Sequence, residues 1–342
     1  MTSQAAGCPP RSLVVLAGGV GGAKYLLGVR RWAQRHGAEV TAIVNTGDDA
    51  TMHGLRVCPD LDSVMYTLAG THDPERGWGQ VGESWVVGEE LAAYGAGPTW
   101  FSLGDKDIAT HLVRTQMLDA GYPLSDVTQA LCTRWPVGVR LLPMSDQRVE
   151  THAIAEVPGE DGPPVKRALH FQEWWVRYRA QLPTEAFVQV GLEQARPAPG
   201  VLEAIAEADL VLVAPSNPVV SIGTILGLQA IRDAVRATSA PVVGTAPLIG
   251  GSPLRGMADT CLRVIGVEAT ALAVGAHYGS RSADGVLDGW LVAPGDGGAI
   301  EGVSVAEAPL LMADPDATAA MVDAAVRLAG AGSARSAGSA DG

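Results

Sequence analysis

The sequence predicts an α/β fold in which helices cover both faces of a mostly parallel sheet and a less regular subdomain is inserted. Two observations support this prediction. The N-terminal part of the chain has the pattern of a strand, a glycine-rich turn, a helix and a second strand, which together form a βαβ unit. Strand-like and helix-like segments then alternate again over residues 209–328, as crossover connections in a parallel sheet require.

The first elements follow from the hydrophobic pattern and the glycines. Residues 13–17 form a short apolar run, typical of a buried parallel strand, and residues 18–22 form a turn with four glycines. Residues 23–36 predict a helix that Gly37 ends. Residues 39–45 alternate in polarity and are rich in β-branched residues, which predicts a second strand.

The later part of the chain repeats this order. Prolines at 218 and 315 stand at the first turn of predicted helices, where proline is favoured, and Asp314 is placed to cap the second of them. Strands are predicted at 209–214, from 241 to 244 and at 289–293, and helices at 218–234, within 258–278 and at 315–328.

The middle of the chain, residues 70–200, is less regular, and we expect it to form an insertion or cap that the sheet supports. Alternating polarity near residues 137–149 indicates antiparallel strands there. We expect a single domain over residues 13–330, a flexible leader at 1–12 and a disordered Gly/Ala/Ser-rich tail at 331–342.

The composition excludes several classes of protein. Of 342 residues, 47% are hydrophobic and 18% are charged, which excludes a disordered chain. The net charge of −13 argues against a nucleic-acid-binding or basic membrane-surface protein, although backbone N–H groups or a metal ion can still bind a phosphate. No run approaches the ~20 apolar residues of a membrane span. The four cysteines lack a CxxC spacing, so we expect a reduced, cytoplasmic protein.

The first candidate site is the glycine-rich turn, with the sequence LAGGVGGAK at residues 16–24. Its glycines let the backbone approach a ligand closely, and the start of the following helix offers free N–H groups to an anion. The third glycine of a dinucleotide-binding pattern is missing, and the Walker A pattern fails as well. The turn therefore either binds an anion or only makes a tight connection. The candidate residues are Gly18, Gly19, Gly21, Gly22 and Lys24.

The second candidate is a set of four aspartates, Asp48, Asp49, Asp60 and Asp62, in NTGDDATMHGLRVCPDLDS at residues 45–63. Because the first two strands are parallel, these acids should emerge beside the glycine turn, at the edge of the sheet where α/β proteins bind ligands. Carboxylates repel one another unless a cation joins them, and Mg²⁺ is bound by one or two carboxylates together with substrate phosphates. The alternative is that these aspartates cap a helix or form a turn.

The third candidate is a predicted helix in LGDKDIATHLVRT at residues 103–115, which Asp105 is placed to cap. Asp107, His111 and Arg114 are spaced so that they share one face of this helix. That face either lies in solvent or binds a substrate, through a carbonyl or hydroxyl group at His111 and an anionic group at Arg114.

The fourth candidate is a second junction between a strand and a helix, in VAPSNPVVSIGTI at residues 213–225. Ser216 and Asn217, which precede Pro218, either cap the helix or hold a second phosphate or a base. The adjacent Trp174 and Trp175 favour packing or a dimer contact over stacking on a ligand.

In this order, the four segments resemble one family, the 2-phospho-L-lactate transferases and phosphoenolpyruvate transferases of coenzyme F-420 biosynthesis. The resemblance covers roughly residues 13–330 and includes DPERGWG at residues 73–79. GLRVCPDLDS and DPERGWG are most similar to the actinobacterial branch, which implies an enolpyruvyl donor and not a lactyl donor. The resemblance implies a Rossmann-like homodimer that uses Mg²⁺.

The activity that this resemblance implies joins the deazaflavin FO to a three-carbon acid through a phosphodiester. The donor is a guanosine diphosphate derivative of that acid, and GMP leaves. We expect Asp49 and Asp62 to bind Mg²⁺, and Asp48 or Asp60 to orient the attacking hydroxyl or take its proton. The glycines and Lys24 would hold the diphosphate, with Ser216, Asn217 and Pro218 at the guanosine side. The residues expected in the FO or acid pocket are Thr46, Asp105, Asp107, Thr110, His111 and Arg114.

Two other functions remain open. A related family of nucleotide-sugar-binding regulators, which are not enzymes, shares the glycine turn and the sheet. That family tends to carry a Ser/Gly-rich run after its acidic pair, where this chain has ATMHGLRVCPDLDS. An NAD(P) dehydrogenase is disfavoured by the missing third glycine and by an aspartate pair where a single ribose-binding acid is expected. The sequence leaves open which three-carbon acid the favoured transferase would transfer.

Overall fold

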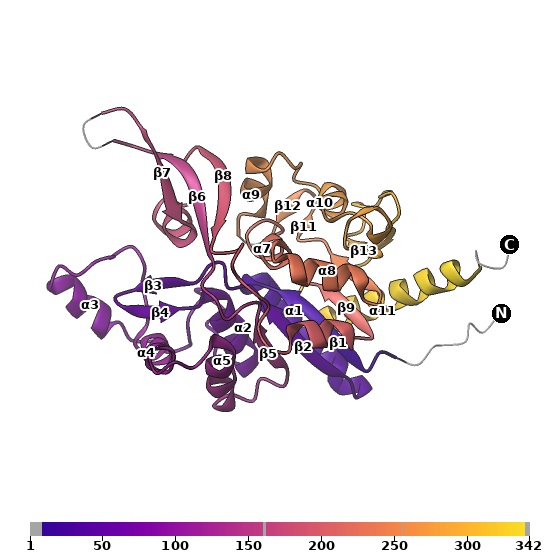
Figure 1. Ribbon diagram of the computed structural model, residues 1–342, viewed down its shortest axis with the longest axis horizontal. Helices are drawn as coiled ribbons and strands as arrows, with labels where there is room; N and C mark the ends of the chain where they lie inside the picture. The colour runs from indigo at the N-terminus through magenta and orange to yellow at the C-terminus, as the bar shows by residue number, and fades with distance from the viewer. Residues whose placement is uncertain (1–8, 160–161, 255, 339–342) are drawn as a thin grey trace.

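The structure, a computed structural model, describes residues 9–159, 162–254 and 256–338. Within them, seven strands form a central sheet in which every strand pairs in parallel with its neighbours (Figure 1). The order is β14-β13-β10-β9-β1-β2-β5. The strands are β1 (Ser12–Ala17), β2 (Glu39–Val44), β5 (Arg140–Pro143), β9 (Leu210–Val213), β10 (Val242–Thr245), β13 (Gly289–Val292) and β14 (Ser304–Glu307).

The chain winds in both directions from the middle of this sheet. Helix α1 (Gly19–His36) leads from β1 to β2, whereas α7 (Ile222–Gly227) and α8 (Gln229–Ala237) lead from β9 to β10, toward the other edge. Because crossover connections are right-handed, helices that connect strands toward opposite edges of the sheet lie on opposite faces of the sheet. The packing agrees, because α1 contacts α2 (Pro59–Ala69) and α11 (Pro315–Gly338), whereas α8 contacts α6 (Val201–Ala206) and α7. The predicted Rossmann-like α/β fold is confirmed, and the winding reverses between β1 and β9.

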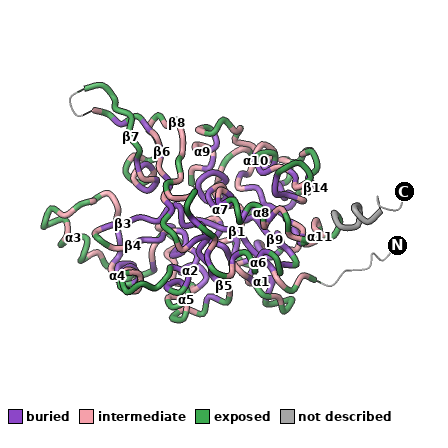
Figure 2. The backbone as a smooth tube through the Cα atoms, in the orientation of Figure 1, coloured by how far each residue is buried: buried purple, intermediate pink, exposed green. Residues whose placement is uncertain are grey.

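The strand register places the candidate loops at one edge. Ala17 of β1 pairs with Val44 of β2, and Leu16 pairs with Val213 of β9. These three strands therefore end at nearly the same level, and their loops emerge together. The strands are among the most deeply buried segments of the chain, as Figure 2 shows, so the edge is rigidly supported.

The predicted antiparallel strands near residues 137–149 are wrong. β5 lies in this stretch, but it pairs in parallel with β2 as the edge strand of the central sheet. Leu141 and Leu142 are both buried, because α5 (Leu124–Thr133) packs against β5. Antiparallel pairing occurs later, where β6 (Glu150–Val157), β7 (Val165–His170) and β8 (Thr184–Val190) form a separate sheet that projects from the main body (Figure 1).

Other boundaries also differ from the prediction. α1 begins at Gly19, so most of the predicted glycine turn forms the first turn of the helix. The predicted helix at 218–234 consists of α7 and α8, because Leu228 is extended between them. The last helix was expected to end at residue 328 but continues to Gly338. Residues 1–8 of the predicted leader and 339–342 of the predicted tail lie outside the described residues.

Further helices and four short strands complete the described part of the chain, and none of its helices has both the length and the apolar character of a membrane span. The helices are α2 (Pro59–Ala69), α3 (Val86–Ala93), α4 (Asp105–Asp119), α6 (Val201–Ala206), α9 (Ala258–Val264), α10 (Ala271–Tyr278), α11 (Pro315–Gly338), a π-helix at Glu173–Arg177 and a 3₁₀ turn at Arg281–Ala283. The remaining strands are β3 (Ala50–Met52), β4 (Leu55–Val57), β11 (Leu248–Ile249) and β12 (Ser252–Pro253).

Candidate active site

A cavity of about 820 Å³, called the central cavity below, lies at the carboxyl edge of the sheet. Its wall includes the residues that follow β1, β9 and β10, and it therefore spans the point where the winding reverses. Open α/β sheets bind their ligands at this position. The predicted site residues that line it are Gly18, Gly19, Gly21, Lys24, Asp48, Asp60, Asp62, Asp107, His111, Ser216 and Asn217.

The glycine turn packs tightly against two other loops. Gly18 N–H donates to Ser216 Oγ at 3.0 Å, and the Ser216 hydroxyl donates to the carbonyl oxygen of Gly18 at 2.7 Å. A Cβ atom on Gly18 would lie 2.6 Å from Asp60 Oδ2 and 2.7 Å from Ser221 Cβ. Only glycine therefore lets the turn approach Asp60 and the loop after β9 this closely. The positive end of the α1 dipole lies at the wall of the cavity, which favours an anion there.

Asp48 and Asp60 are buried carboxylates at the wall of the cavity. Asn45 Nδ2 donates to Asp60 Oδ2 at 2.9 Å and to Asp48 Oδ1 at 3.4 Å. Burial and the charges of Asp60 and Asp49 raise the pKa of Asp48 well above its ordinary value. Burial also raises the pKa of Asp60 to about 7, although hydrogen bonds from Asn45 and the Gly19 backbone lower it. A cation between Asp48 and Asp60 would offset the unfavourable free energy of burying two negative charges, so this pair of carboxylates fits a divalent metal ion.

Asp49 faces a different environment, although it follows Asp48 directly. Its Oδ2 atom accepts hydrogen bonds from Arg56 Nη2 and Cys58 Sγ, both at 3.0 Å. Burial raises the pKa of Asp49 to about 6, against the lowering effects of Arg56 and Cys58. Asp49 does not line the central cavity, so the structure brings only Asp62 of the predicted metal pair to its wall.

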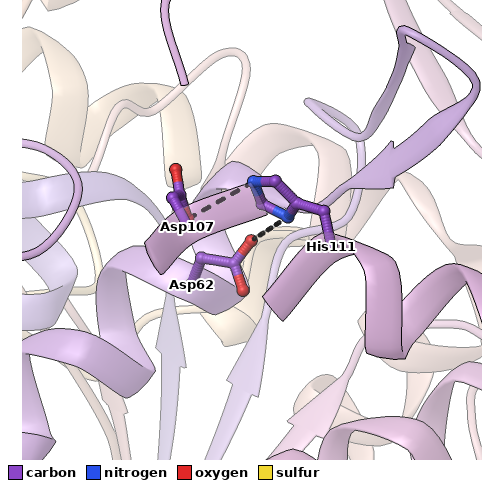
Figure 3. Close-up of side chains that lie close together, drawn as sticks. All are labelled: Asp62, Asp107 and His111. Carbon is purple, nitrogen blue, oxygen red and sulfur yellow. Dashed lines mark ion pairs between the residues drawn. The ribbon is translucent and has the colours of Figure 1, made fainter. Parts of the chain in front are cut away.

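A buried polar network connects α2 and α4 beside the cavity (Figure 3). His111 lies between Asp107 and Asp62, with Nε2 at 3.3 Å from Asp107 Oδ1 and Nδ1 at 3.7 Å from Asp62 Oδ2. Arg114 forms an ion pair with Asp62, and its Nη1 donates to His111 Nδ1 at 2.9 Å. Burial raises the pKa of Asp107, but His111, the Tyr66 hydroxyl and Arg114 outweigh it and hold that pKa below the ordinary value.

The ligand atoms of Asp62, Asp107 and His111 lie within 4.8 Å of one another, a spacing that suits a metal ion. The hydrogen-bond pattern disfavours one. Arg114 can only donate, so His111 Nδ1 accepts and the neutral ring carries its proton on Nε2, the nitrogen that points at Asp107. A metal-binding histidine needs the opposite arrangement, with the second nitrogen donating to an acceptor. We therefore interpret the cluster as a polar network, in which His111 Nε2 and Asp62 Oδ2 have no hydrogen-bond partner among the described residues.

Several predicted site residues do not line the cavity, namely Gly22, Thr46, Asp49, Asp105, Thr110, Arg114 and Pro218. The expectation that Asp105 caps α4 is wrong, because Gly104 takes the cap position. The Asp105 carboxylate instead accepts from Ser84 and from the backbone N–H groups of Val86 and Val87 at the start of α3. The alternative that Asn217 caps the next helix is wrong, because Ser221 takes the cap position of α7; Asn217 Oδ1 instead accepts from Val219 N–H at 2.9 Å in the preceding turn, and Asn217 lines the cavity.

Aromatic residues that no single sequence motif predicted as site residues also line the central cavity. The lining of the cavity includes six aromatic residues, called the aromatic wall below: Tyr66, Trp78, Trp100, Phe101, Phe171 and Trp175. DPERGWG was the available signal, because it brings Trp78 and Arg76 to the wall. Of the tryptophan pair, Trp174 is buried and donates to Thr184 at 2.8 Å, as expected for packing, whereas Trp175 borders the cavity.

Comparison with known proteins shows the family of this chain. The family model described as 2-phospho-L-lactate transferase CofD matches residues 13–318. A phosphoenolpyruvate transferase from Mycolicibacterium smegmatis is 61% identical over 327 residues, which cover 93% of this chain and 98% of that protein. A phosphoenolpyruvate transferase from Nocardia farcinica is 59% identical and covers 96% of this chain and 99% of its own length.

Two solved structures of one Bacillus halodurans protein, described as a member of the UPF0052 family, share the fold. They superpose with TM-scores of 0.56 and 0.58 at 18% and 17% identity, and they cover 92% of this chain and 99% of their own. The predicted transferase class is confirmed by the family and by the curated relatives. The chain belongs to the 2-phospho-L-lactate transferase CofD family.

Proposed function

We propose that this protein transfers a phosphoenolpyruvyl group from a guanosine diphosphate-linked donor to the ribityl hydroxyl of the deazaflavin FO, in coenzyme F-420 biosynthesis. The observation that carries the proposal is the central cavity, which is lined by the glycine turn, by Asp48 and Asp60 with their raised pKa values, and by the aromatic wall. The relatives named phosphoenolpyruvate transferase support an enolpyruvyl group over a lactyl group.

The donor half of the site is proposed at the glycine turn. The N–H groups at the start of α1 suit the diphosphate, and Lys24 lines the cavity without an ion pair to any described residue. Ser216 and Asn217 border the same space and are proposed at the guanosine side. This arrangement gives an acidic protein a local positive field for an anionic donor.

We propose that Mg²⁺ binds at Asp48 and Asp60, which replaces the pair Asp49 and Asp62 expected from the sequence. Asp48 and Asp60 both line the cavity and both have raised pKa values, whereas Asp49 is already paired with Arg56. The ion would neutralise diphosphate charge and lower the pKa of a nearby hydroxyl. Asp62 remains as a carboxylate at the wall of the cavity.

The acceptor half is proposed at the aromatic wall. A planar deazaflavin offers faces that stack on Trp100, Phe101 or Trp175, which line the same cavity as Asp107 and His111 of α4. The hydroxyl oxygen of the acceptor would attack the phosphorus that carries the enolpyruvyl group. The bond from that phosphorus to the bridging oxygen breaks, GMP leaves with the electron pair, and the hydroxyl proton passes to a cavity carboxylate.

We also propose that the protein acts as a homodimer.

The test is incubation of the purified protein with FO, the enolpyruvyl guanosine-diphosphate donor and Mg²⁺, followed by mass spectrometry. We expect GMP and the phosphodiester of FO in equal amounts. An equimolar mixture of enolpyruvyl, lactyl and glyceryl donors identifies the preferred acid by product mass. Binding of GDP without any phosphodiester would overturn the proposal and favour a nucleotide-binding regulator.

A further inference from the structure

Arg114 does not line the central cavity, yet it holds two side chains that do. We propose that Arg114 is a positioning residue, which fixes Asp62 and His111 so that Asp62 Oδ2 accepts the hydrogen bond of the attacking acceptor hydroxyl. This inference rests on the proposed function and assigns a role within the same site.

The contacts of Arg114 use separate edges of its guanidinium group. Its side chain is only 2% exposed. Nη2 forms the ion pair with Asp62 Oδ1, and Nη1 donates to His111 Nδ1 at 2.9 Å and to the carbonyl oxygen of Arg56 at 3.3 Å. A planar fork can make these contacts at once, whereas the single ammonium group of lysine cannot reproduce their geometry.

Asp62 keeps one oxygen for a ligand. Oδ1 is held by Arg114, whereas Oδ2 is buried and has no hydrogen-bond partner among the described residues, although Asp62 lines the cavity. A buried acceptor without a donor is costly, and an O–H group supplies the donor. Asp107 is a second carboxylate at this part of the wall, so the chemistry favours an uncharged alcohol over a phosphate or carboxylate.

His111 completes the arrangement. Because Nδ1 accepts from Arg114, Nε2 carries the proton and faces Asp107 Oδ1 at 3.3 Å. The same Asp107 oxygen accepts from the Tyr66 hydroxyl at 2.7 Å. These contacts connect α2 with α4 and fix the ring of His111 next to Asp62. Arg114 therefore determines both the direction of the Asp62 carboxylate and the tautomer of His111.

The test compares Arg114→Lys, Arg114→Met and the double variant Asp62→Asn/Arg114→Met. Arg114→Met should fold poorly, since it leaves Asp62 charged, buried and unpaired, whereas the double variant removes both charges and should recover a Tm close to that of the wild type. In both Arg114→Lys and the double variant, kcat should fall about 100-fold, a loss expected from a misplaced catalytic group. The KM for the donor should change less than about twofold, because the glycine turn is untouched.

Arg31→Lys is the matched control. Arg31 pairs with Asp316 at the surface, with its side chain 49% exposed, so this variant should keep the wild-type kcat. Near-normal kcat in folded Arg114→Lys or in the double variant would overturn the positioning role.

Histidine ¹⁵N spectra test the arrangement independently of turnover. The wild type should show His111 with an unprotonated Nδ1 and a protonated Nε2, and the double variant should lose this single tautomer. A protonated Nδ1 in the wild type would overturn the inference. A wild type that binds GDP and shows the expected tautomer, but forms no phosphodiester, would refute the proposed function and not the geometry of Arg114.

Discussion

The amide of Asn45, directly after β2, donates a hydrogen bond of 2.9 Å to Asp60 Oδ2 in the first turn of α2. The backbone N–H of Gly19 at the start of α1 also bonds to Asp60. One carboxylate is thus held by two elements at the edge of the sheet, and burial still raises its pKa to about 7. Buried groups that lower the stability of the folded protein in this way are typical of functional positions.

Asp60→Asn should raise the stability of the metal-free protein at pH 8 and abolish transfer. The amide cannot ionise, so a gain on the order of 1–2 kcal/mol is expected, while the proposed metal loses a ligand. Thermal unfolding and product formation measure the two effects. Asp316→Asn is the control, because its pKa is lowered by Arg31, and this variant should gain no stability and keep full activity. A less stable Asp60→Asn protein would contradict the cost assigned to this carboxylate.

The free energy of unfolding of the metal-free protein should fall as the pH rises from about 4 to 8. Asp49 and Asp60 have folded-state pKa values of about 6 and about 7, above the ordinary value of 3.8. At these two carboxyl groups the folded state therefore binds more protons than the unfolded state in this window, so their contribution to the free energy of unfolding falls as the pH rises. Mg²⁺ should raise Tm more at pH 8 than at pH 5, because protons compete with the ion. Denaturant unfolding across this range, with and without Mg²⁺, tests both slopes, and a flat profile would count against them.

Gly18→Ala should destabilise the protein by about 1–3 kcal/mol, as overpacking does. The added Cβ would lie 2.6 Å from Asp60 Oδ2 and 2.7 Å from Ser221 Cβ, so the glycine turn must shift. GDP binding, measured by calorimetry, should weaken with it. The control is Gly88→Ala in α3, where the new Cβ would meet no described atom within 4 Å apart from its chain neighbours and the backbone of its own helix, and a gain of up to about 1 kcal/mol is expected. Equal effects of both substitutions would refute the close approach.

Ser216→Ala should raise the KM for the donor with a smaller effect on kcat. The hydroxyl donates to the Gly18 carbonyl and accepts from the Gly18 N–H, so it ties the loop after β9 to the glycine turn. Steady-state kinetics with varied donor test this. Ser125→Ala is the comparison, since Ser125 bonds to Asp146 and does not line the cavity. An unchanged KM in Ser216→Ala would remove Ser216 from the donor site.

The sequence was sufficient to predict which loops meet, because parallel strands bring their carboxyl ends to one edge. Gly18 and Asp60 thus lie in contact, as the order of elements implies. The sequence was not sufficient to predict which of the adjacent residues Asp48 and Asp49 lines the central cavity. Asp49 forms an ion pair with Arg56 of β4. No local sequence pattern reveals that the hairpin of β3 and β4 brings this arginine back to Asp49.

The errors in the fold have similar causes. Alternating polarity indicates antiparallel strands near residue 140, but β5 pairs in parallel with β2, which comes from a distant part of the chain. The capping role of Asp105 was misassigned because α3 folds back and presents the N–H groups of Val86 and Val87 to its carboxylate. Local propensity describes single elements, whereas such contacts are tertiary.

The most direct test of the account is a crystal structure with GDP and Mn²⁺ in place of Mg²⁺, in which anomalous scattering locates the ion. The account predicts one peak within bonding distance of Asp48 and Asp60, next to the diphosphate at the glycine turn. A peak held by Asp62, Asp107 and His111, or by Asp49, would contradict it, as would bound GDP with no ion beside these two carboxylates.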